Sequence, residues 1–415
     1  MIGRYVDNRL RIGDLAPKEI SHLLELHELA LAQASRYPRK RFLFERLRKS
    51  EGRRFTGVVG PRGSGKTVLL RQLARELDDS VYISADTLAG GDLFDIAARL
   101  HGTMGVKFIL LDEVHFLPGF DSVLKKIYDF LDVRVIFTSS VSIAMYDSPH
   151  DLSRRVELLL LPPFGLREYI YFTSGLELPS LAIEDIAARR WSSEHLRRAS
   201  PVFDRYLKGG LLPFSLEEPD VLPLVGNILK KILADDLPRV ARLPLDEIDL
   251  IEKMIEFIGL SEVEDISYSS LSRNLGITKY KAQKYTDLLQ KAFVLQVVKP
   301  AGTGVTREPK ILMYLPYRLL YREFGRALGA MREDFCVEAL AAAGISARYL
   351  KSSRGRKTPD FLVETPSGKL ALEVGGRGKS MRQFKGITLD RKLVLVHADE
   401  SEGPRRPLYL LGYLS

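Results

Sequence analysis

Residues 60–67 of the chain read Gly-Pro-Arg-Gly-Ser-Gly-Lys-Thr and complete the pattern GxxxxGK[ST]. An apolar run over residues 55–59 precedes them and an amphipathic stretch over residues 68–77 follows, so a predicted strand and a predicted helix flank the pattern. Glycines allow backbone amides to turn toward phosphate oxygens, and the following helix adds the positive end of its dipole. These residues predict a phosphate-binding loop; the alternative interpretation is a Gly-rich turn without a ligand.

The side chains of this loop have separate expected roles. Lys66 is expected to reach the β and γ phosphates, and the hydroxyl of Thr67 is expected to bind magnesium. ATP and Mg²⁺ are therefore the expected cofactors. The rest of the loop is expected to surround the phosphates: Gly60, Pro61, Arg62, Gly63, Ser64 and Gly65.

A pair of acidic residues follows another predicted strand. The apolar residues 108–111 run into Asp112 and Glu113. Asp112 is expected to hold magnesium through water, and Glu113 is expected to polarise the attacking water as a general base. His115 follows two residues later and is interpreted as a polar residue of the loop.

Hydroxyl and guanidinium groups complete the predicted nucleotide site. The apolar run 133–137 ends in Thr138 and Ser139, either of which is expected to contact the γ phosphate. Arg154 and Arg155 precede another apolar run, and a guanidinium there is expected to reach a nucleotide held by an adjacent subunit. This predicts a homo-oligomer, with a hexameric ring as one form; the alternative is a solvated pair of arginines.

The length of 415 residues and the changes in pattern indicate several domains. Continuous apolar strands that alternate with helices predict an α/β fold with a parallel sheet covered on both faces. Helical patterns prevail after Pro162 and Pro163. The predicted segments are a helical N-terminal lead-in at 1–50, a P-loop ATPase core at 51–172, a helical lid at 173–260, a winged helix at 261–325 and a small α/β domain at 326–415.

Cysteine usage and hydropathy bear on the compartment. Cys336 is the only cysteine, so an internal disulfide is impossible, and the sequence has no Cys/His zinc pattern. The first residues lack the apolar core of a signal peptide, and no apolar run is long enough to span a membrane. A cytoplasmic protein is expected, and the scarcity of Asn and Gln favours a thermophilic source.

The predicted winged helix carries a candidate DNA-binding face. Residues 271–277 form a helix and a Gly turn, Thr278 caps a second helix, and two apolar strands follow around a Gly-Thr-Gly tip. Lys279, Lys281 and Lys284 lie in the first turns of the second helix, where lysines are expected to contact DNA phosphates. The alternative is a winged helix used only for packing.

Basic charge is concentrated in the C-terminal segment. The chain has a net charge of +9, and residues 345–392 hold twelve Lys or Arg against four Asp or Glu. Such Gly-interleaved basic runs suit phosphate contacts without sequence reading, although a solvated basic surface is the alternative. The expected DNA-binding residues of this segment are Lys351, Arg354, Arg356, Lys357, Arg377 and Lys379.

The same segment holds acids in the order of a PD-(D/E)xK nuclease core. Asp360 and Glu373 are the expected pair for a shared magnesium ion, with Glu338 as a helper. Gly375 stands where that pattern expects a lysine, so the domain is predicted to bind DNA without cutting it. Lys379 could reach back to supply the missing ammonium.

Taken together, these motifs resemble a family. The phosphate loop, Asp112-Glu113, Phe137-Thr-Ser-Ser, Arg155 and the segment at 161–168 are similar to archaeal and bacterial AAA-type (AAA+ superfamily) ATPases with a C-terminal winged helix and a restriction-endonuclease-like domain. The resemblance covers the chain from residue 55 onward. It implies ATP and magnesium, and it implies that the ATPase core closes near residues 169–174.

Three functions follow as hypotheses. The first is an ATP-hydrolysing DNA-binding protein that remodels DNA, with branched or junction DNA as one candidate substrate by analogy of fold. The second is an active ATP-dependent DNA nuclease. The third is a nucleotide-dependent regulatory switch that binds a protein partner or promoter DNA.

Overall fold

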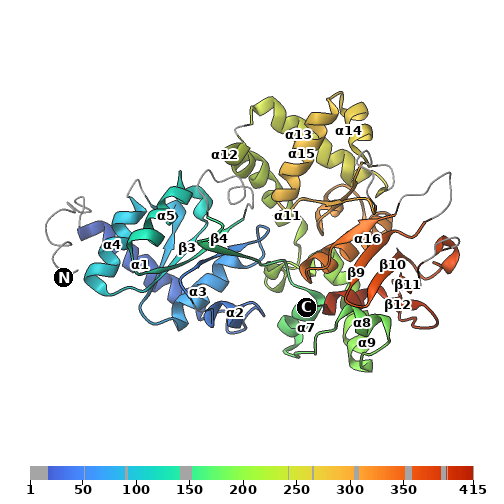
Figure 1. Cartoon of the computed structure of the whole chain (residues 1–415), viewed down its shortest axis with the longest axis horizontal. Helices are drawn as coiled ribbons and strands as arrows, with labels where there is room; N and C mark the ends of the chain where they lie inside the picture. Colours follow the sequence, from blue (N-terminus) through green and yellow to red (C-terminus); the bar gives the residue numbers. More distant parts are fainter. Residues whose placement is uncertain are drawn as a thin grey trace. The chain divides into compact units, whose positions relative to one another are not determined.

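The computed structural model of the chain describes residues 17–50, 52–88, 92–140, 152–241, 243–263, 266–302, 308–350, 358–384, 389 and 391–414. The chain divides into two compact units, Met1–Leu161 and Pro162–Ser415. Figure 1 shows the first unit in blue to green and the second in green to red. Within these described residues, no helix is both long and apolar enough to cross a bilayer.

The first unit is built on a parallel sheet of five strands in the order β2-β3-β4-β1-β5. The predicted α/β class and the predicted parallel sheet are confirmed. The apolar run that follows the two arginines, which was not assigned to a strand, forms an edge strand beside β1. The strands are β1 Phe55–Val59, β2 Ser80–Ser84, β3 Phe108–Asp112, β4 Arg134–Ser139 and β5 Val156–Leu160.

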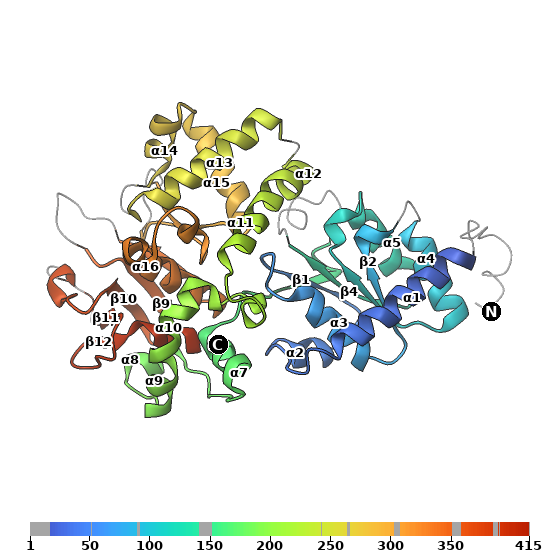
Figure 2. The same cartoon turned by 180° about the vertical axis from the view of Figure 1, so that it is seen from behind.

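Helices cover both faces of this sheet because its strands are apolar on both sides. Leu110 packs in one core cluster with residues of α3, whereas Ile109 and Leu111 pack in the other with residues of α4 and α5. Helices α1, α2 and α3 lie along one side of the sheet (Figure 2). The helices are α1 Pro17–Ala34, α2 Phe44–Arg48, α3 Lys66–Glu76, α4 Leu93–Met104 and α5 Phe120–Phe130.

The second unit begins with helices. Helix α7, Leu166–Ser174, contacts the short helix Leu408–Tyr413 near the C-terminus, and the N–H of Phe164 donates to the carbonyl of Leu211. The predicted ATPase core at 51–172 includes α7, whereas the compact unit ends at Leu161. The helices that follow are α8 Ile183–Ala187, α9 Ser193–Ala199, α10 Phe203–Arg205, α11 Leu222–Lys231, α12 Leu237–Ala241 and α13 Leu245–Leu260.

Two helices and a hairpin occupy the region of the predicted winged helix. Helix α14, Tyr268–Leu275, ends at Gly276, whose φ of 65° favours glycine, and the Thr278 hydroxyl caps α15, Lys279–Lys291. Strands β6, Leu295–Val298, and β7, Lys310–Met313, pair antiparallel. The assignment of these elements to a winged helix stays a prediction, as does DNA binding by them.

A mixed sheet of order β12-β11-β10-β9-β8 forms the C-terminal part. Helix α16, Phe324–Ala342, packs against β10 and the hairpin strand β7 (Figure 1). The sequence pattern predicts a helix over residues 333–342, and the structure extends this helix back to Phe324. The strands are β8 Ala347–Tyr349, β9 Phe361–Thr365, β10 Gly368–Gly375, β11 Arg391–Val396 and β12 Arg405–Pro407.

Candidate functional site

The three predicted nucleotide-binding segments meet at one edge of the parallel sheet. Strand β4 lies between β1 and β3, so the loop after β1, the hydroxyls after β4 and the acids after β3 are neighbours. Ligands of open parallel sheets bind at this carboxyl edge. The N–H of Gly60 donates to the carbonyl of Ser139, which joins two of the segments directly.

The loop at 60–67 has the backbone that its glycines predict. Gly63 and Gly65 adopt φ of 79° and 88°, and a Cβ on Gly60 would lie 2.1 Å from the carbonyl oxygen of Leu161. Lys66, with 4% of its surface exposed, donates through Nζ to the carbonyls of Gly60 and Pro61 at 2.9 Å each. The ammonium therefore lies inside the loop at the start of α3.

The loop has the chemistry of a phosphate site. The buried hydroxyl of Ser64 has no hydrogen-bond partner within the described residues, and Lys66 and the N-terminus of α3 supply positive charge. Arg41 donates to the carbonyl of Ser64 from the lead-in segment. No spaced motif links Arg41 to the loop in the sequence, so this contact was missed. These residues fit the phosphates of a nucleotide.

Asp112 is held by two hydroxyl groups. The hydroxyl of Tyr82 donates to Oδ2 at 2.9 Å, and the hydroxyl of Thr138 donates to Oδ1. Burial and the charge of Asp112 raise the pKa of Tyr82 well above its ordinary value, so the phenol stays protonated. Sequence reasoning missed Tyr82, which lies on strand β2 next to β3. These two hydrogen bonds orient the carboxylate of Asp112, and a carboxylate is a suitable ligand for magnesium.

Thr138 also contacts the predicted general base. The backbone N–H of Glu113 donates to Thr138 Oγ1 at 2.8 Å, and Glu113 adopts a left-handed φ of 53°. Thr138 and Ser139 are both fully buried, with Ser139 Oγ 3.4 Å from Nδ1 of His115. Thr138 thus positions the two acids, and the phosphate contact expected from Thr138 or Ser139 stays a prediction.

The two predicted trans arginines differ in environment. Arg155 forms an ion pair with Asp129 at 3.1 Å and lies over the ring of Tyr128, whereas Arg154 is exposed. Both precede β5 and lie at the amino edge of the parallel sheet, opposite the phosphate loop. From that edge, neither guanidinium can reach the nucleotide of its own subunit. Their action on another subunit stays a prediction.

The lysines of α15 are paired with acids of the same unit. Lys279 lies 3.1 Å from Glu308, and Lys281 and Lys284 lie 3.0 and 3.6 Å from Glu247 of α13. The hydrogen bond from Lys281 lowers the pKa of Glu247. The lysine side chains remain between 41% and 63% exposed, so a polyanion can compete with the acids for them.

Asp360 and Glu373 lie in a buried cluster of acids and lysines. Val374 donates its N–H to Asp360 Oδ2 at 2.8 Å, and Lys379 Nζ lies 2.6 Å from Glu373 Oε1. Burial raises the pKa of Asp360 to about 6 and also raises that of Glu373. Within the described residues, no group of three or more His, Cys, Asp or Glu has the spacing of a metal site.

Glu333 of α16, rather than Glu338, acts electrostatically on this pair. Lys310 of β7 lies 2.5 Å from Glu333, whose pKa burial raises to about 7. Glu338 instead accepts the N–H of Leu315 at 3.0 Å, so the helper role expected for Glu338 is not supported. The two glutamates are five residues apart, which turns them roughly 140° from each other around a helix.

The basic C-terminal segment is described only in part. Lys351, Arg354, Arg356 and Lys357 lie outside the described residues. Arg377 is 80% exposed and pairs with Glu400, whereas Lys379 points toward the acid cluster. Lys379 is therefore bound to an acid of its own chain rather than displayed for DNA.

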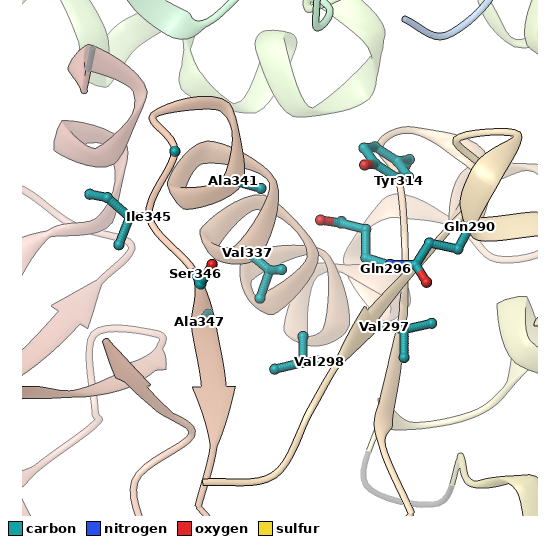
Figure 3. Close-up of a pocket in the computed structure, with 11 residues that line it drawn as sticks. Gln290, Gln296, Val297, Val298, Tyr314, Val337, Ala341, Ile345, Ser346 and Ala347 are labelled. Atoms are coloured by element: carbon teal, nitrogen blue, oxygen red, sulfur yellow. The ribbon is translucent and has the colours of Figure 1, made fainter. Parts of the chain in front are cut away.

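A cavity of about 320 Å³ lies in the second unit between the hairpin and α16 (Figure 3). Gln290, Gln296, Tyr314 and Ser346 supply its polar side chains, and none of the residues that line it is charged. It offers no cation for a phosphate group and so differs from the loop at 60–67. Its apolar wall consists of Val297, Val298, Val337, Ala341, Ile345 and Ala347.

Known proteins match the chain in sequence and in structure. It is 28% identical over 368 residues to the uncharacterized protein MJ1637 of Methanocaldococcus jannaschii. The matched region covers 79% of this chain and 76% of that protein. A mutant of Thermotoga maritima RuvB has 17% identity and a TM-score of 0.30 and covers 69% of this chain and 91% of its own. AMPPCP-bound DnaA from Aquifex aeolicus has 17% identity and a TM-score of 0.24, with coverage of 60% of this chain and 85% of the DnaA chain.

The sequence match to a family is more specific. The family model for an AAA domain matches residues 52–170, which include the loop at 60–67, Asp112 and Glu113. Residues 52–170 are therefore similar to an AAA domain, and the P-loop pattern lies inside the matched segment.

Proposed function

We propose that the chain hydrolyses ATP at the carboxyl edge of the parallel sheet. The observation that carries the proposal is the position of strand β4 between the lysine-bearing loop and the two acids. Thr138 contacts both acids, and the carbonyl of Ser139 accepts the N–H of Gly60 in the loop. A loop that only bound nucleotide would not need Glu113 next to a magnesium ligand.

Each residue of this site would have a separate role. Lys66 and the amides of the loop would bind the phosphates, and Thr67 and Asp112 would hold the magnesium ion. Magnesium-bound ATP supplies the transferable phosphoryl group. Glu113 would accept a proton from the attacking water, and Tyr82 and Thr138 would keep Asp112 oriented.

Replacement of the general base tests this proposal. Glu113→Gln keeps the shape of the side chain, so we expect nucleotide affinity to persist while turnover falls by about a hundredfold or more. Glu25→Gln serves as the matched control because Glu25 lies on the exposed surface of α1. Release of inorganic phosphate and binding of a fluorescent nucleotide are the two measurements. Equal turnover in wild type and Glu113→Gln would refute the assignment.

We further propose that the ATPase binds and remodels DNA, with branched or junction DNA as the candidate substrate. The exposed lysines of α15, the exposed Tyr280 and the basic segment 345–392 support contacts with phosphates and bases. A homo-oligomer, for example a ring, would let Arg154 or Arg155 complete the site of a neighbouring subunit.

The acid partner of the α15 lysines allows a direct test of DNA binding. Glu247→Gln removes the charge that holds Lys281 and Lys284, so we expect tighter DNA binding. Alanine at both lysines should weaken binding and reduce the salt dependence by about two counterions. Glu252→Gln on the same helix is the control. If neither variant changes DNA affinity, α15 is not the contact surface.

A second candidate function, metal-dependent cleavage of DNA, is favoured by the contact of Lys379 with Glu373. Carboxylates of Asp360 and Glu373 would hold a divalent cation, and the buried Glu373 Oε2 has no hydrogen-bond partner within the described residues. Bound metal supplies a Lewis acid for phosphodiester hydrolysis. Lys379 would then provide the ammonium that the sequence lacks at position 375.

Metal binding separates this candidate from a fold that only binds DNA. Mn²⁺ binding, followed by electron paramagnetic resonance, should be lost in Asp360→Asn and kept in Glu364→Gln, which changes an exposed acid of β9. DNA cleavage should likewise be lost in Asp360→Asn and kept in Glu364→Gln. It should also be lost in Lys379→Ala. Mn²⁺ binding without cleavage of any DNA form would reject the nuclease and leave a metal-binding domain.

A further inference from the structure

His115 lies in the short turn Val114–Phe116 directly after strand β3. Only 1% of its side chain is exposed, although a histidine on a loop would usually be solvated. A polar ring that is buried so completely needs hydrogen-bond partners for its nitrogens. The interpretation of His115 as a polar loop residue therefore does not describe its environment.

Three polar side chains surround the imidazole. Nδ1 lies 3.2 Å from Oε2 of Glu113 and 3.4 Å from Oγ of Ser139, and Nε2 lies 3.3 Å from Oγ of Ser140. The approach of Nδ1 to Glu113 is a close contact rather than a hydrogen bond, because the buried Oε2 has no hydrogen-bond partner within the described residues. Nδ1 makes its hydrogen bond with Ser139, and Nε2 makes one with Ser140.

Both the backbone and the side chain of Glu113 are held by neighbours. Its N–H donates to Thr138, and its left-handed φ of 53° is a conformation that a non-glycine residue keeps only when its surroundings fix it. The buried ring of His115 lies 3.2 Å from Oε2 of Glu113 and limits where that carboxylate can move. A general base needs a carboxylate in a fixed place to accept a proton from water.

We propose that His115 is a positioning residue that fixes the carboxylate of Glu113 for hydrolysis and links it to the phosphate loop. The link runs from His115 to Ser139, whose carbonyl accepts the N–H of Gly60 at 3.3 Å. A shift of the loop when nucleotide binds would thus reach Glu113 through three contacts, from Gly60 to Ser139, from Ser139 to His115 and from His115 to Glu113. The inference rests on the proposed ATP hydrolysis and adds a residue to it.

Variants at position 115 can separate the two faces of the ring. Asn places an amide N–H near the position of Nδ1, Gln places one near Nε2, and Leu has neither. We expect His115→Leu and His115→Gln to lower kcat by about tenfold to a hundredfold, because misplacement of a general base costs that much. His115→Asn should stay within about threefold of wild type. Nucleotide affinity should change in none of them.

A purely structural role would give a different result. The thermal midpoints of all three variants are measured beside kcat, with the exposed His22→Leu of α1 as the control. The inference is overturned if His115→Leu keeps the wild-type kcat, or if His115→Asn loses as much activity as His115→Leu. If Glu113→Gln turns over as fast as wild type, ATP hydrolysis at this site has failed and the positioning role falls with it.

Discussion

Lys379 reaches back past the end of strand β10 and places its ammonium 2.6 Å from a carboxylate oxygen of Glu373. The path of its side chain crosses the space beside Gly375, where an added Cβ would lie 2.1 Å from Cγ of Lys379. Glycine at position 375 thus makes room for the lysine. The nuclease pattern expects a lysine at position 375. The glycine at this position instead leaves space for the side chain of Lys379.

Gly375→Ala should therefore displace Lys379 without unfolding the domain, because a flexible lysine can move aside. We expect Mn²⁺-dependent DNA cleavage, where wild type shows it, to fall in Gly375→Ala as far as in Lys379→Ala. Gly378→Ala is the control, since its added Cβ meets nothing within 4 Å. Unchanged cleavage in Gly375→Ala would show that Lys379 does not act through this path.

The buried ion pair of Arg318 and Asp334 should govern the stability of the second unit. Both side chains are 1% exposed, and Arg318 also donates to the carbonyl of Ile258. Arg318→Met leaves the Asp334 charge buried, so we expect the free energy of unfolding to fall by about 3–5 kcal/mol. Urea unfolding followed by the fluorescence of Trp191, the only tryptophan, measures this.

Arg322→Met is the comparison for that variant. Its partner Glu262 is 63% exposed, so loss of this pair should cost less than about 1 kcal/mol. Similar losses in the two variants would contradict the account of the buried pair.

Glu338 should make stability depend on pH. Burial raises its pKa to about 8, whereas an unfolded glutamate ionises near 4.5. The native state therefore keeps a proton that the unfolded state loses, and stability declines as pH rises from 4.5 to 8. Glu338→Gln should match wild type near pH 4 and exceed it above pH 8, on the order of a few kcal/mol.

The exposed Glu364→Gln controls for the loss of one charge in this comparison. The same urea titrations at each pH give the values. A pH dependence that is identical in Glu338→Gln and wild type would place the proton elsewhere.

Arg154, rather than Arg155, should serve a neighbouring subunit. Arg155 is held by Asp129, whereas Arg154 is exposed at the edge of the sheet away from its own nucleotide loop. Arg154→Ala and Lys66→Ala should each abolish turnover alone. A mixture of the two variants should recover part of the turnover, because one variant still supplies Lys66 and the other still supplies Arg154. Absence of recovery in the mixture, or full activity of Arg154→Ala, would exclude this role.

The sequence predicted the parts of the fold that depend on local patterns. The apolar strands next to the loop at 60–67 were readable because each is continuous, and the hydroxyl of Thr278 indicated the start of α15. The strands β8 and β12 have only three residues each, too few for a period to show. Their positions follow from pairing with longer strands.

The site was predictable only where residues follow a spaced motif. Lys66, Asp112 and Glu113 lie in such motifs, whereas Tyr82 and His115 are single residues brought to the site by strand order and burial. Glu333 was missed in favour of Glu338 because the start of α16, and hence the face of each residue, could not be read from the pattern.

ATP turnover in the presence of DNA tests the central claim most directly. The rate of phosphate release is measured without DNA and with single-stranded, duplex, forked and four-way DNA, and Glu113→Gln serves as the blank. The account predicts that at least one DNA form raises the rate and that Glu113→Gln abolishes turnover with every form. A rate that none of these DNA forms changes would contradict a DNA-remodelling ATPase.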